Sequence, residues 1–407
     1  MSITIADIEA ARRVIQDAVL RTPMLPAPRL SALTGADVYV KYENLQVTNS
    51  FKDRGALNKL ASLGEAERRR GVIAMSAGNH AQAVAYHAAR LKIPATIVMP
   101  VTTPFVKVAA TKSHGAEVVL DGETVAEAQK RCEQILAERK LTLVHPYDDA
   151  RIIAGQGTIV LEMLEETPDL DVLAIPIGGG GLIAGSAIAA RALNPKIEIV
   201  GVEAALYPSV WNALHNDSRA IGGATLAEGI AVKNVGKLTL PIIRDLVADI
   251  VLVDEAHLER AVNAYLTLQK TMAEGAGAAG LAAMLAEPAR FRGKKVGLVL
   301  CGGNIDPRIL ASIMVRELER ETRVVSFRLT IPDRPGVLGT IATRLGELGA
   351  NILEVHHRRL LLDVPAKGAK LDVTIETRDG AHAAEILAAL AADGYQPARL
   401  QAGAAME

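Results

Sequence analysis

The feature that most constrains this chain is a repeated alternation of short apolar runs with longer alanine-rich helical patterns, between about residues 37 and 320. The runs are DVYVKYE, GVIAMSA, ATIVMP, AEVVLD, LTLVHP, DVLAIPIGG, IEIVGVEA and KVGLVLCGG. Apolar runs of this length, each followed by a turn and a helix, are typical of strands buried on both faces of a parallel sheet. We therefore predict an α/β architecture, with functional residues at the carboxyl ends of the strands.

Composition narrows the class of protein. A chain of 407 residues is too long for one average core, so we expect two or three. Half of the residues are hydrophobic and only 3% are aromatic, which favours helices packed closely on sheets. The formal net charge of -1 gives no electrostatic footprint for nucleic acid or an anionic membrane, so we expect a small-molecule partner.

The N-terminus and the cysteines also exclude some classes. The first residues, MSITIADIEAARRVIQDAV, predict an amphipathic helix without the apolar core of a signal peptide, so we expect a cytoplasmic protein. No apolar run reaches the roughly 18 residues that a membrane span needs. Cys132 and Cys301 form no CxxC or other metal-ligand pattern, which argues against a disulfide or zinc framework.

The rhythm changes after about residue 323. The pattern predicts a strand, a helix, two strands, a helix and a short last strand, from VVSFRLTIP through NILEVHHRRL and LDVTIETR to YQPARLQ. The order βαββαβ is that of a ferredoxin-like unit, and such an appendage suggests regulation or assembly. The charged stretch RELERETR, residues 316–323, is either a linker or the solvated end of a helix. We place the domains at residues 1–320 and 325–407.

The first motif with chemistry is TNSFKDRGA, which delivers Lys52 at the expected start of a helix. A nucleophilic lysine needs a partly desolvated place near positive potential, which lowers its pKa and frees its amine to form a Schiff base. A helix N-terminus supplies such potential. Most lysines in this setting are nevertheless ordinary surface residues, so the motif alone decides nothing.

The second motif, SAGNH, ends one strand and opens the next helix. Its backbone N–H groups and the side-chain amide of Asn79 can bind an anion such as a substrate carboxylate. The alternative is an ordinary helix cap, and His80 is expected to be a structural histidine.

The third motif is the run Gly178, Gly179, Gly180 and Gly181, between a strand and a helix. Its exposed N–H groups can hold a phosphate at the helix N-terminus. The motif does not identify the cofactor that carries the phosphate, because Gly179, Gly181 and Gly185 with Glu203 also match a dinucleotide-binding pattern weakly. A nicotinamide-dependent oxidoreductase is therefore a rival from another class.

The fourth motif is CGGN at the end of the strand KVGLVL. Cys301 is a small neutral hydrogen-bonding residue, followed by two glycines that leave room for a flat ring. Buried free cysteines are also commonly just small hydrophobic residues.

Taken in order, SFKDRGA, SAGNHAQAVA, GGGGLIAG, AEGAGAAG and CGGNID resemble the threonine dehydratase and serine racemase group of fold-type II pyridoxal-phosphate enzymes, over roughly residues 5 to 320. The resemblance implies a fold like that of tryptophan synthase β, with two α/β subdomains, the smaller at about residues 48–150. It implies a pyridoxal 5'-phosphate enzyme that converts L-threonine to 2-oxobutanoate and ammonia and also acts on L-serine. Serine racemase and hydroxyaspartate dehydratase are alternatives within the same family.

The resemblance also implies roles for individual residues. Lys52 forms the Schiff base and is the catalytic base, Asn79 contacts the phenolic oxygen of the cofactor, and Cys301 faces its pyridine nitrogen. The remaining cofactor contacts are Phe51 on the ring, Glu274 near its edge, and Gly178, Gly179, Gly180, Gly181 and Leu182 at the phosphate. The substrate carboxylate loop consists of Ser76, Ala77, Gly78, Asn79 and His80.

The C-terminal unit resembles an ACT domain in its loop PDRPG and in the helix that follows. This implies an amino-acid effector, such as isoleucine or valine, bound between two copies, and hence a regulated homo-oligomer, a dimer or tetramer. Asp333, Gly336 and Asn351 are the candidate effector-site residues. The alternative is a domain that only assembles subunits.

Four positions depart from the family pattern. Asn49 stands where many relatives have glycine, which either narrows the substrate preference or rebuilds the turn. Cys301 replaces a common serine, and its thiol is a weaker donor. Ala77 stands where racemases of this family have serine; alanine cannot move a proton, which favours dehydration. Near Glu203, Ser209 replaces a second acid, so we expect no divalent metal, and either no ion or a monovalent cation.

Overall fold

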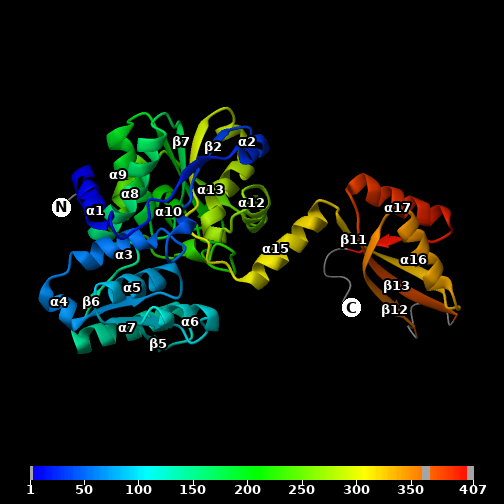
Figure 1. Ribbon diagram of the computed structural model, residues 1–407, viewed down its shortest axis with the longest axis horizontal. Coiled ribbons are helices and arrows are strands. Elements are labelled where there is room, and N and C mark those ends of the chain that lie inside the picture. The colour runs from blue at the N-terminus through cyan, green and yellow to red at the C-terminus, as the bar shows by residue number, and fades with distance from the viewer. Residues whose placement is uncertain (1–2, 360–366, 401–407) are drawn as a thin grey trace. The chain divides into compact units, whose positions relative to one another are not determined.

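The computed structural model describes residues 3–359 and 367–400, and the chain divides into two compact units, residues 1–305 and 306–407 (Figure 1). The division lies at the N-terminal end of helix α15 (Pro307–Arg320), whereas the boundary expected from the sequence lies at its C-terminal end. No helix in the described part of the chain is long and apolar enough to cross a membrane.

The larger sheet of the first unit has six strands. In order across the sheet they are β1 (Met24–Pro26), β2 (Asp37–Lys41), β10 (Lys295–Val299), β7 (Val172–Pro176), β8 (Glu198–Ala204) and β9 (Asp249–Val253). All neighbouring pairs are parallel except β1 with β2. The predicted parallel sheet is therefore confirmed, and it contains two further strands, β1 and β9, that the sequence pattern does not predict.

Helices cover both faces of this sheet. Figure 1 shows α8 (Ala150–Glu166) and α9 (Gly181–Leu193) on one side, and α12 (Glu255–Leu268) and α13 (Gly275–Ala286) on the other. Leu173 and Ile175 of β7 pack in one core with residues of α8 and α9. The other helices are α1 (Ile5–Ile15), α2 (Pro28–Thr34), α10 (Ser209–His215), α11 (Thr239–Leu246), α14 (Pro288–Phe291) and the short 3-10 helices η1 (Glu43–Leu45) and η2 (Glu228–Ile230).

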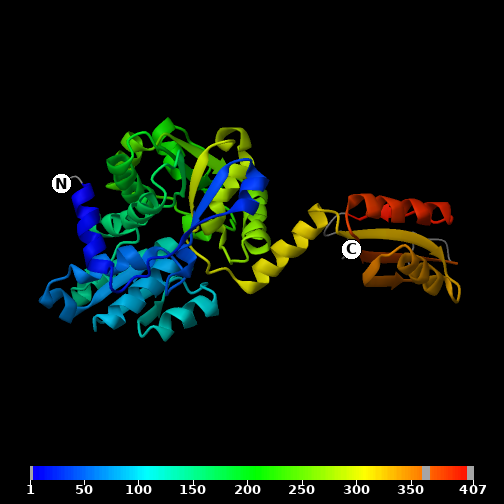
Figure 2. The same ribbon diagram turned by 45° about the horizontal axis from the view of Figure 1, so that its top comes forward.

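The smaller sheet of the first unit is fully parallel. Its strands, in order, are β5 (Glu117–Leu120), β4 (Ala95–Met99), β3 (Val72–Met75) and β6 (Thr142–Leu143). One face packs against α3 (Lys52–Ala61) and α5 (Asn79–Arg90), and the other packs against α7 (Val125–Arg139). The helices α4 (Glu65–Arg70) and α6 (Phe105–Ser113) complete this subdomain, seen from a second angle in Figure 2.

Helix α3 is held tightly against α8 of the larger subdomain. A Cβ atom on Gly155 would lie 2.7 Å from the Cα of Gly55, so only glycines allow this approach. Arg54, which is 1% exposed, donates to the buried carboxylates of Glu43 and Glu162, at 2.7 to 2.8 Å. Lys41 donates to the same Glu162 at 2.6 Å. This buried ion network fixes the helix that begins with Lys52.

The second unit begins with α15 and continues as a four-stranded antiparallel sheet in the order β12 (Asn351–Arg358), β13 (Gly368–Glu376), β11 (Val324–Pro332), β14 (Ala398–Arg399). Its helices are α16 (Val337–Glu347) and α17 (Gly380–Ala392). Alternate residues of β11 are buried in one core with both helices. The chain order is the predicted βαββαβ, and α15 runs through most of the charged stretch. Leu360 and Gln401, which end two of the predicted strand segments, lie outside the described residues.

Candidate active site

Lys52 is the first residue of α3, and its amine lies among protein atoms. The Nζ donates a hydrogen bond to the carbonyl oxygen of Pro146 at 2.7 Å and lies 5.1 Å from the centre of the Phe51 ring. Removal from solvent lowers the pKa of Lys52 to about 8, although Cys301 and Glu274 act in the opposite direction. Part of the side chain is still accessible. This is the environment that a nucleophilic amine requires.

The lysine motif is joined directly to the CGGN motif, about 250 residues later in the chain. Ser50 and Gly302 form an isolated antiparallel bridge. On either side of it, the N–H of Phe51 donates to Cys301 O, and the N–H of Gly303 donates to Asn49 O, both at 3.0 Å. The structure therefore brings together the first and fourth motifs.

Asn49 adopts a φ of 56°, in the left-handed region. Glycine enters this region without strain, and asparagine is among the few other residues that tolerate it. Asn49 thus adopts a turn conformation that a glycine at this position would adopt without strain. Its conformation supports the second of the two explanations for this departure, the rebuilt turn.

Cys301 is 3% exposed, and its thiol donates toward the carbonyl oxygen of Ala276 in α13 at 3.5 Å. Burial raises the pKa of this thiol above its usual range, and the negative charge of Glu274 adds to the effect. Cys301 is therefore a neutral group at the end of β10, as expected for the partner of a ring nitrogen that is not fully protonated.

Asn79, the first residue of α5, contacts two side chains from distant segments. Its Nδ2 donates to Glu274 Oε1 at 2.6 Å, and its Oδ1 accepts from Asn304 Nδ2 at 2.8 Å. Burial raises the pKa of Glu274 to about 7, while the bond from Asn79 opposes the rise. The second and fourth motifs and the AEGAGAAG segment therefore meet at one point.

The loop from Ser76 to His80 borders open space. A Cβ atom on Gly78 would meet nothing within 4 Å, so a ligand can approach the backbone there. His80 is different: its Nε2 contacts Val144 O at 2.8 Å, and burial lowers its pKa to about 3. The imidazole is therefore neutral and tied to the end of the smaller sheet, which agrees with the expected structural histidine.

The glycine run connects β7 to α9. Among the described residues, the N–H groups of 178–182 find no hydrogen-bond acceptor, so five donors are available at a helix N-terminus. Gly180 has a φ of 93°, which favours glycine. A Cβ on Gly179 would lie 2.3 Å from the ring of Tyr147. Because Tyr147 follows Pro146, the contact partner of Lys52, the third motif lies beside the first.

Together these groups fit pyridoxal phosphate. The five free N–H donors suit a phosphate dianion, the desolvated amine of Lys52 suits a Schiff base, and the neutral thiol of Cys301 suits a pyridine nitrogen. Glu203, which a nicotinamide dinucleotide would need, is already bonded: it accepts the N–H groups of Val210 and Trp211 at 2.8 and 2.9 Å. That hydrogen bonding leaves the dinucleotide pattern without its ribose ligand.

The environment of Glu203 also bears on metal binding. Burial raises its pKa to about 7, and the hydroxyl of Ser209 donates to Val232 O at 2.6 Å. Within residues 3–359 and 367–400, no three His, Cys, Asp or Glu side chains are grouped so as to hold a metal ion. Cys132 and Cys301 are free buried thiols.

Three contacting residues were not predicted from the sequence as site residues. Pro146 and Tyr147 follow β6, and the rule that sites lie beyond the carboxyl ends of parallel strands would have identified them. Asn304 was visible as part of CGGN, but its contact with Asn79 crosses 225 positions of the chain. No local pattern predicts such a contact.

The candidate effector residues occupy two ends of the second unit. Asp333 forms an ion pair with Arg359 at 3.1 Å, and Gly336 opens α16 with a φ of 88°. Asn351, by contrast, is at the far end of the sheet: it pairs with Glu376 of β13, whereas Pro332, the last residue of β11, pairs with Gly368 at the other end of β13. Eight residues of strand separate these ends, roughly 26 Å. Within one copy the three residues do not form one pocket.

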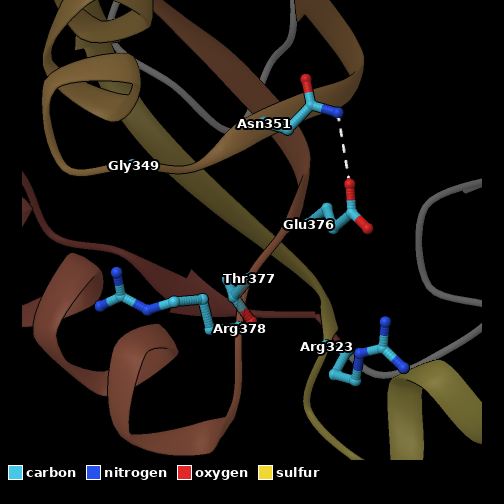
Figure 3. Close-up of a pocket in the computed structure, with 6 residues that line it drawn as sticks. All are labelled: Arg323, Gly349, Asn351, Glu376, Thr377 and Arg378. Atoms are coloured by element: carbon cyan, nitrogen blue, oxygen red, sulfur yellow. Dashed lines mark hydrogen bonds between the residues drawn. The ribbon is translucent and has the colours of Figure 1, made fainter.

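Asn351 borders a hollow of about 480 Å³ (Figure 3). Its Nδ2 donates to Glu376 Oε2 at 3.3 Å. The residues that line the hollow are Arg323, Gly349, Asn351, Glu376, Thr377 and Arg378.

Comparisons with known proteins cover both units. The chain matches the family described as pyridoxal-phosphate dependent enzyme over residues 15–302, and the ACT domain over residues 325–394. The L-threonine ammonia-lyase of Thermotoga maritima is 43% identical over 396 residues, 97% of this chain and 98% of that protein.

Two solved structures are similar to most of this chain. Maize serine racemase matches with a TM-score of 0.72 and 33% identity, over 79% of this chain and all of that chain. The processed form of threonine deaminase isoform 2 from Solanum lycopersicum matches with a TM-score of 0.72 and 35% identity, over 76% of this chain and 86% of that one.

Proposed function

The chain belongs to the pyridoxal-phosphate dependent enzyme family and carries a C-terminal ACT domain, and from this premise we propose that it is an L-threonine ammonia-lyase. The reaction converts L-threonine to 2-oxobutanoate and ammonia. Water leaves the substrate in the elimination and is taken up again when the resulting imine hydrolyses. The name of the Thermotoga maritima relative supports this substrate, and L-serine is expected to react in the same way. The family, fold class and cofactor expected from the sequence are confirmed.

The observation that carries the proposal is the state of Lys52. Its amine lies beside the Phe51 ring with a pKa lowered to about 8, so about one molecule in ten has a neutral amine that can accept a proton at pH 7, far more than for an ordinary lysine. Bound pyridoxal phosphate supplies an electron sink for the charge that develops at the α-carbon of the substrate. Lys52 Nζ accepts the α-proton, and the hydroxyl group then leaves the β-carbon as water, with a proton equivalent to the one taken from the α-carbon.

The neighbouring residues favour elimination. Cys301 is a neutral thiol, and as the partner of the pyridine nitrogen it would not hold a proton there as a carboxylate would, which favours prompt loss of the β-substituent. The backbone around Gly78 borders the open space that a substrate carboxylate needs. Ala77 has no group that moves a proton, so the second base that racemisation needs is missing at this position.

Regulation is the proposed role of residues 325–407, with residues 1–320 as the catalytic domain. Because Asp333 and Asn351 lie at opposite ends of one sheet, an amino-acid effector that contacts both requires two copies of the domain. We propose isoleucine or valine as effector, and a homodimer or homotetramer in the cytoplasm. Sedimentation of the purified protein and assays with each amino acid test these points.

The function is tested with purified protein and a panel of L-threonine, L-serine and 3-hydroxyaspartate. We expect equal amounts of 2-oxobutanoate and ammonia from L-threonine, and pyruvate without D-serine from L-serine. Formation of D-serine at a rate similar to that of pyruvate would favour the racemase alternative. Release of keto acid from 3-hydroxyaspartate alone would favour the hydroxyaspartate dehydratase.

A further inference from the structure

The side-chain amide of Asn79 is held from both ends by residues outside its own helix. Its oxygen accepts from Asn304 Nδ2 at 2.8 Å, and its nitrogen donates to Glu274 Oε1 at 2.6 Å. An amide nitrogen carries two hydrogens. The bond to Glu274 uses one of them, so one N–H of Asn79 is left for a ligand.

The orientation of this amide is fixed by a backbone group. Asn304 Nδ2 also donates to the carbonyl oxygen of Thr48 at 2.9 Å. A backbone carbonyl can only accept, so the end of Asn304 that faces it must be the NH₂ group. The same NH₂ group faces Asn79, which must therefore present its oxygen. The carbonyl of Thr48 thus determines which end of the Asn304 side chain is the donor, and Asn304 in turn determines which end of the Asn79 amide is the acceptor.

Glu274 alone would not impose this orientation. Burial raises its pKa to about 7, so a large share of the carboxyl groups carry a proton at neutral pH. A protonated carboxyl donates as well as accepts, and it could therefore pair with either end of the Asn79 amide. Asn304 removes this ambiguity.

The backbone at Gly302 packs closely against the side chains of Glu274 and Asn79. A Cβ on Gly302 would lie 2.4 Å from Glu274 Oε1 and 3.0 Å from Asn79 Nδ2, so a side chain at this position would displace the Glu274 carboxyl group from its bond with Asn79. The N–H of Glu274 donates to Gly302 O at 3.1 Å, which holds its segment against the same strand end.

We propose that Asn304 is a positioning residue, which uses the carbonyl of Thr48 to orient the Asn79 amide with its free N–H toward the phenolic oxygen of the cofactor. This inference rests on the proposed function, because the cofactor contact of Asn79 is part of it. Without Asn304 the amide can turn over and present its oxygen to the phenolic oxygen. Two acceptors then face each other without a hydrogen bond.

The test compares the wild type with Asn304→Asp, which keeps the shape but loses the donor, and with Asn304→Ala, which adds no charge. Asn194→Asp is the matched control: Asn194 Nδ2 also donates to backbone carbonyls, those of Pro168 and Leu170, but outside the site. For each protein the visible absorption band of the bound cofactor is titrated with pH, and the affinity of the cofactor-free protein for pyridoxal phosphate is measured.

A donor to the phenolic oxygen draws negative charge from that oxygen. It therefore lowers the pKa of the nearby Schiff-base nitrogen, whose proton the negative charge would otherwise stabilise. Both Asn304 variants should therefore raise the midpoint of the titration by about one pH unit and bind the cofactor about tenfold more weakly. Their kcat should fall more than their KM changes, and Asn194→Asp should match the wild type.

Midpoints like that of the wild type would overturn the positioning role, as would equal shifts in Asn194→Asp. Loss of the folded state in both Asn304 variants, judged by circular dichroism, would also contradict it. The two failures are distinguishable: a wild type without a visible band contradicts the proposed function, whereas a band that the variants leave unchanged contradicts only the role of Asn304.

Discussion

Phe51 donates its backbone N–H to the carbonyl oxygen of Cys301 at 3.0 Å, and this contact joins two segments separated by about 250 positions. Lys52 follows Phe51 directly, so the bridge sets the amine and the neutral thiol on one scaffold. The position of the nucleophile thus depends on backbone hydrogen bonds between these two segments.

The lowered pKa of Lys52 predicts how cofactor loading depends on pH. An amine with a pKa of about 8 is neutral in about one molecule in ten at pH 7, against about one in three thousand for a pKa of 10.5. The rate at which cofactor-free protein gains its visible band should rise with pH and level off above about 8. A rate that still rises at pH 10 would indicate an ordinary lysine.

The contact between Gly179 and Tyr147 predicts the effect of a single methyl group. In Gly179→Ala the new Cβ would lie 2.3 Å from the Tyr147 ring, so the phosphate loop must shift. We expect about tenfold or greater loss of affinity for pyridoxal phosphate, measured by fluorescence titration. Gly339→Ala is the control, because nothing lies within 4 Å of its Cβ position, and its affinity should not change.

The turn at Asn49 predicts a neutral substitution. Glycine adopts the φ of 56° without strain, so Asn49→Gly should keep the ratio of kcat/KM for L-threonine over L-serine within about twofold. Steady-state assays with both substrates measure this ratio. A large change would show that Asn49 selects the substrate, which is the explanation that its conformation disfavours.

The buried network around Arg54 predicts a large loss of stability. Arg54→Met leaves the buried carboxylates of Glu43 and Glu162 short of positive charge, and we expect the free energy of unfolding to fall by about 3–5 kcal/mol. Urea denaturation measures this loss. The exposed pair of Arg69 with Glu65 is the comparison, and Arg69→Ala should cost less than about 1 kcal/mol. Equal losses of unfolding free energy in the two variants would contradict the expectation that the buried ion pairs of Arg54 matter more for stability than an exposed pair.

Much of the fold could be predicted from the sequence, because strands buried on both faces leave continuous apolar runs. All eight predicted runs of the first unit contain strands. The strand β9, DIVLV, has the same composition but is separated from β8 by residues 205–248, whose helices are short, and β1 has only three residues at the sheet edge. Neither strand therefore stands in the close alternation of strand and long helix that identified the others.

The site could be predicted only where its residues form local motifs. Lys52, Asn79, the glycine run and Cys301 each stand at the end of a strand or the start of a helix, where their chemistry is visible in the sequence. The contact of Asn304 with Asn79, and that of Tyr147 with Gly179, arise from tertiary packing. The roles of the individual site residues stay predictions until their variants are measured.

The most direct measurement is the effect of Lys52→Ala on turnover of L-threonine. The control is Lys59→Ala, because Lys59 lies on the same helix as Lys52 but forms an ion pair with Asp149 of another segment. Our account predicts that Lys52→Ala stays folded, loses the visible band of the cofactor, and releases 2-oxobutanoate at least about a hundredfold more slowly, whereas Lys59→Ala retains both. Release of 2-oxobutanoate by Lys52→Ala at the rate of the wild type would contradict the account.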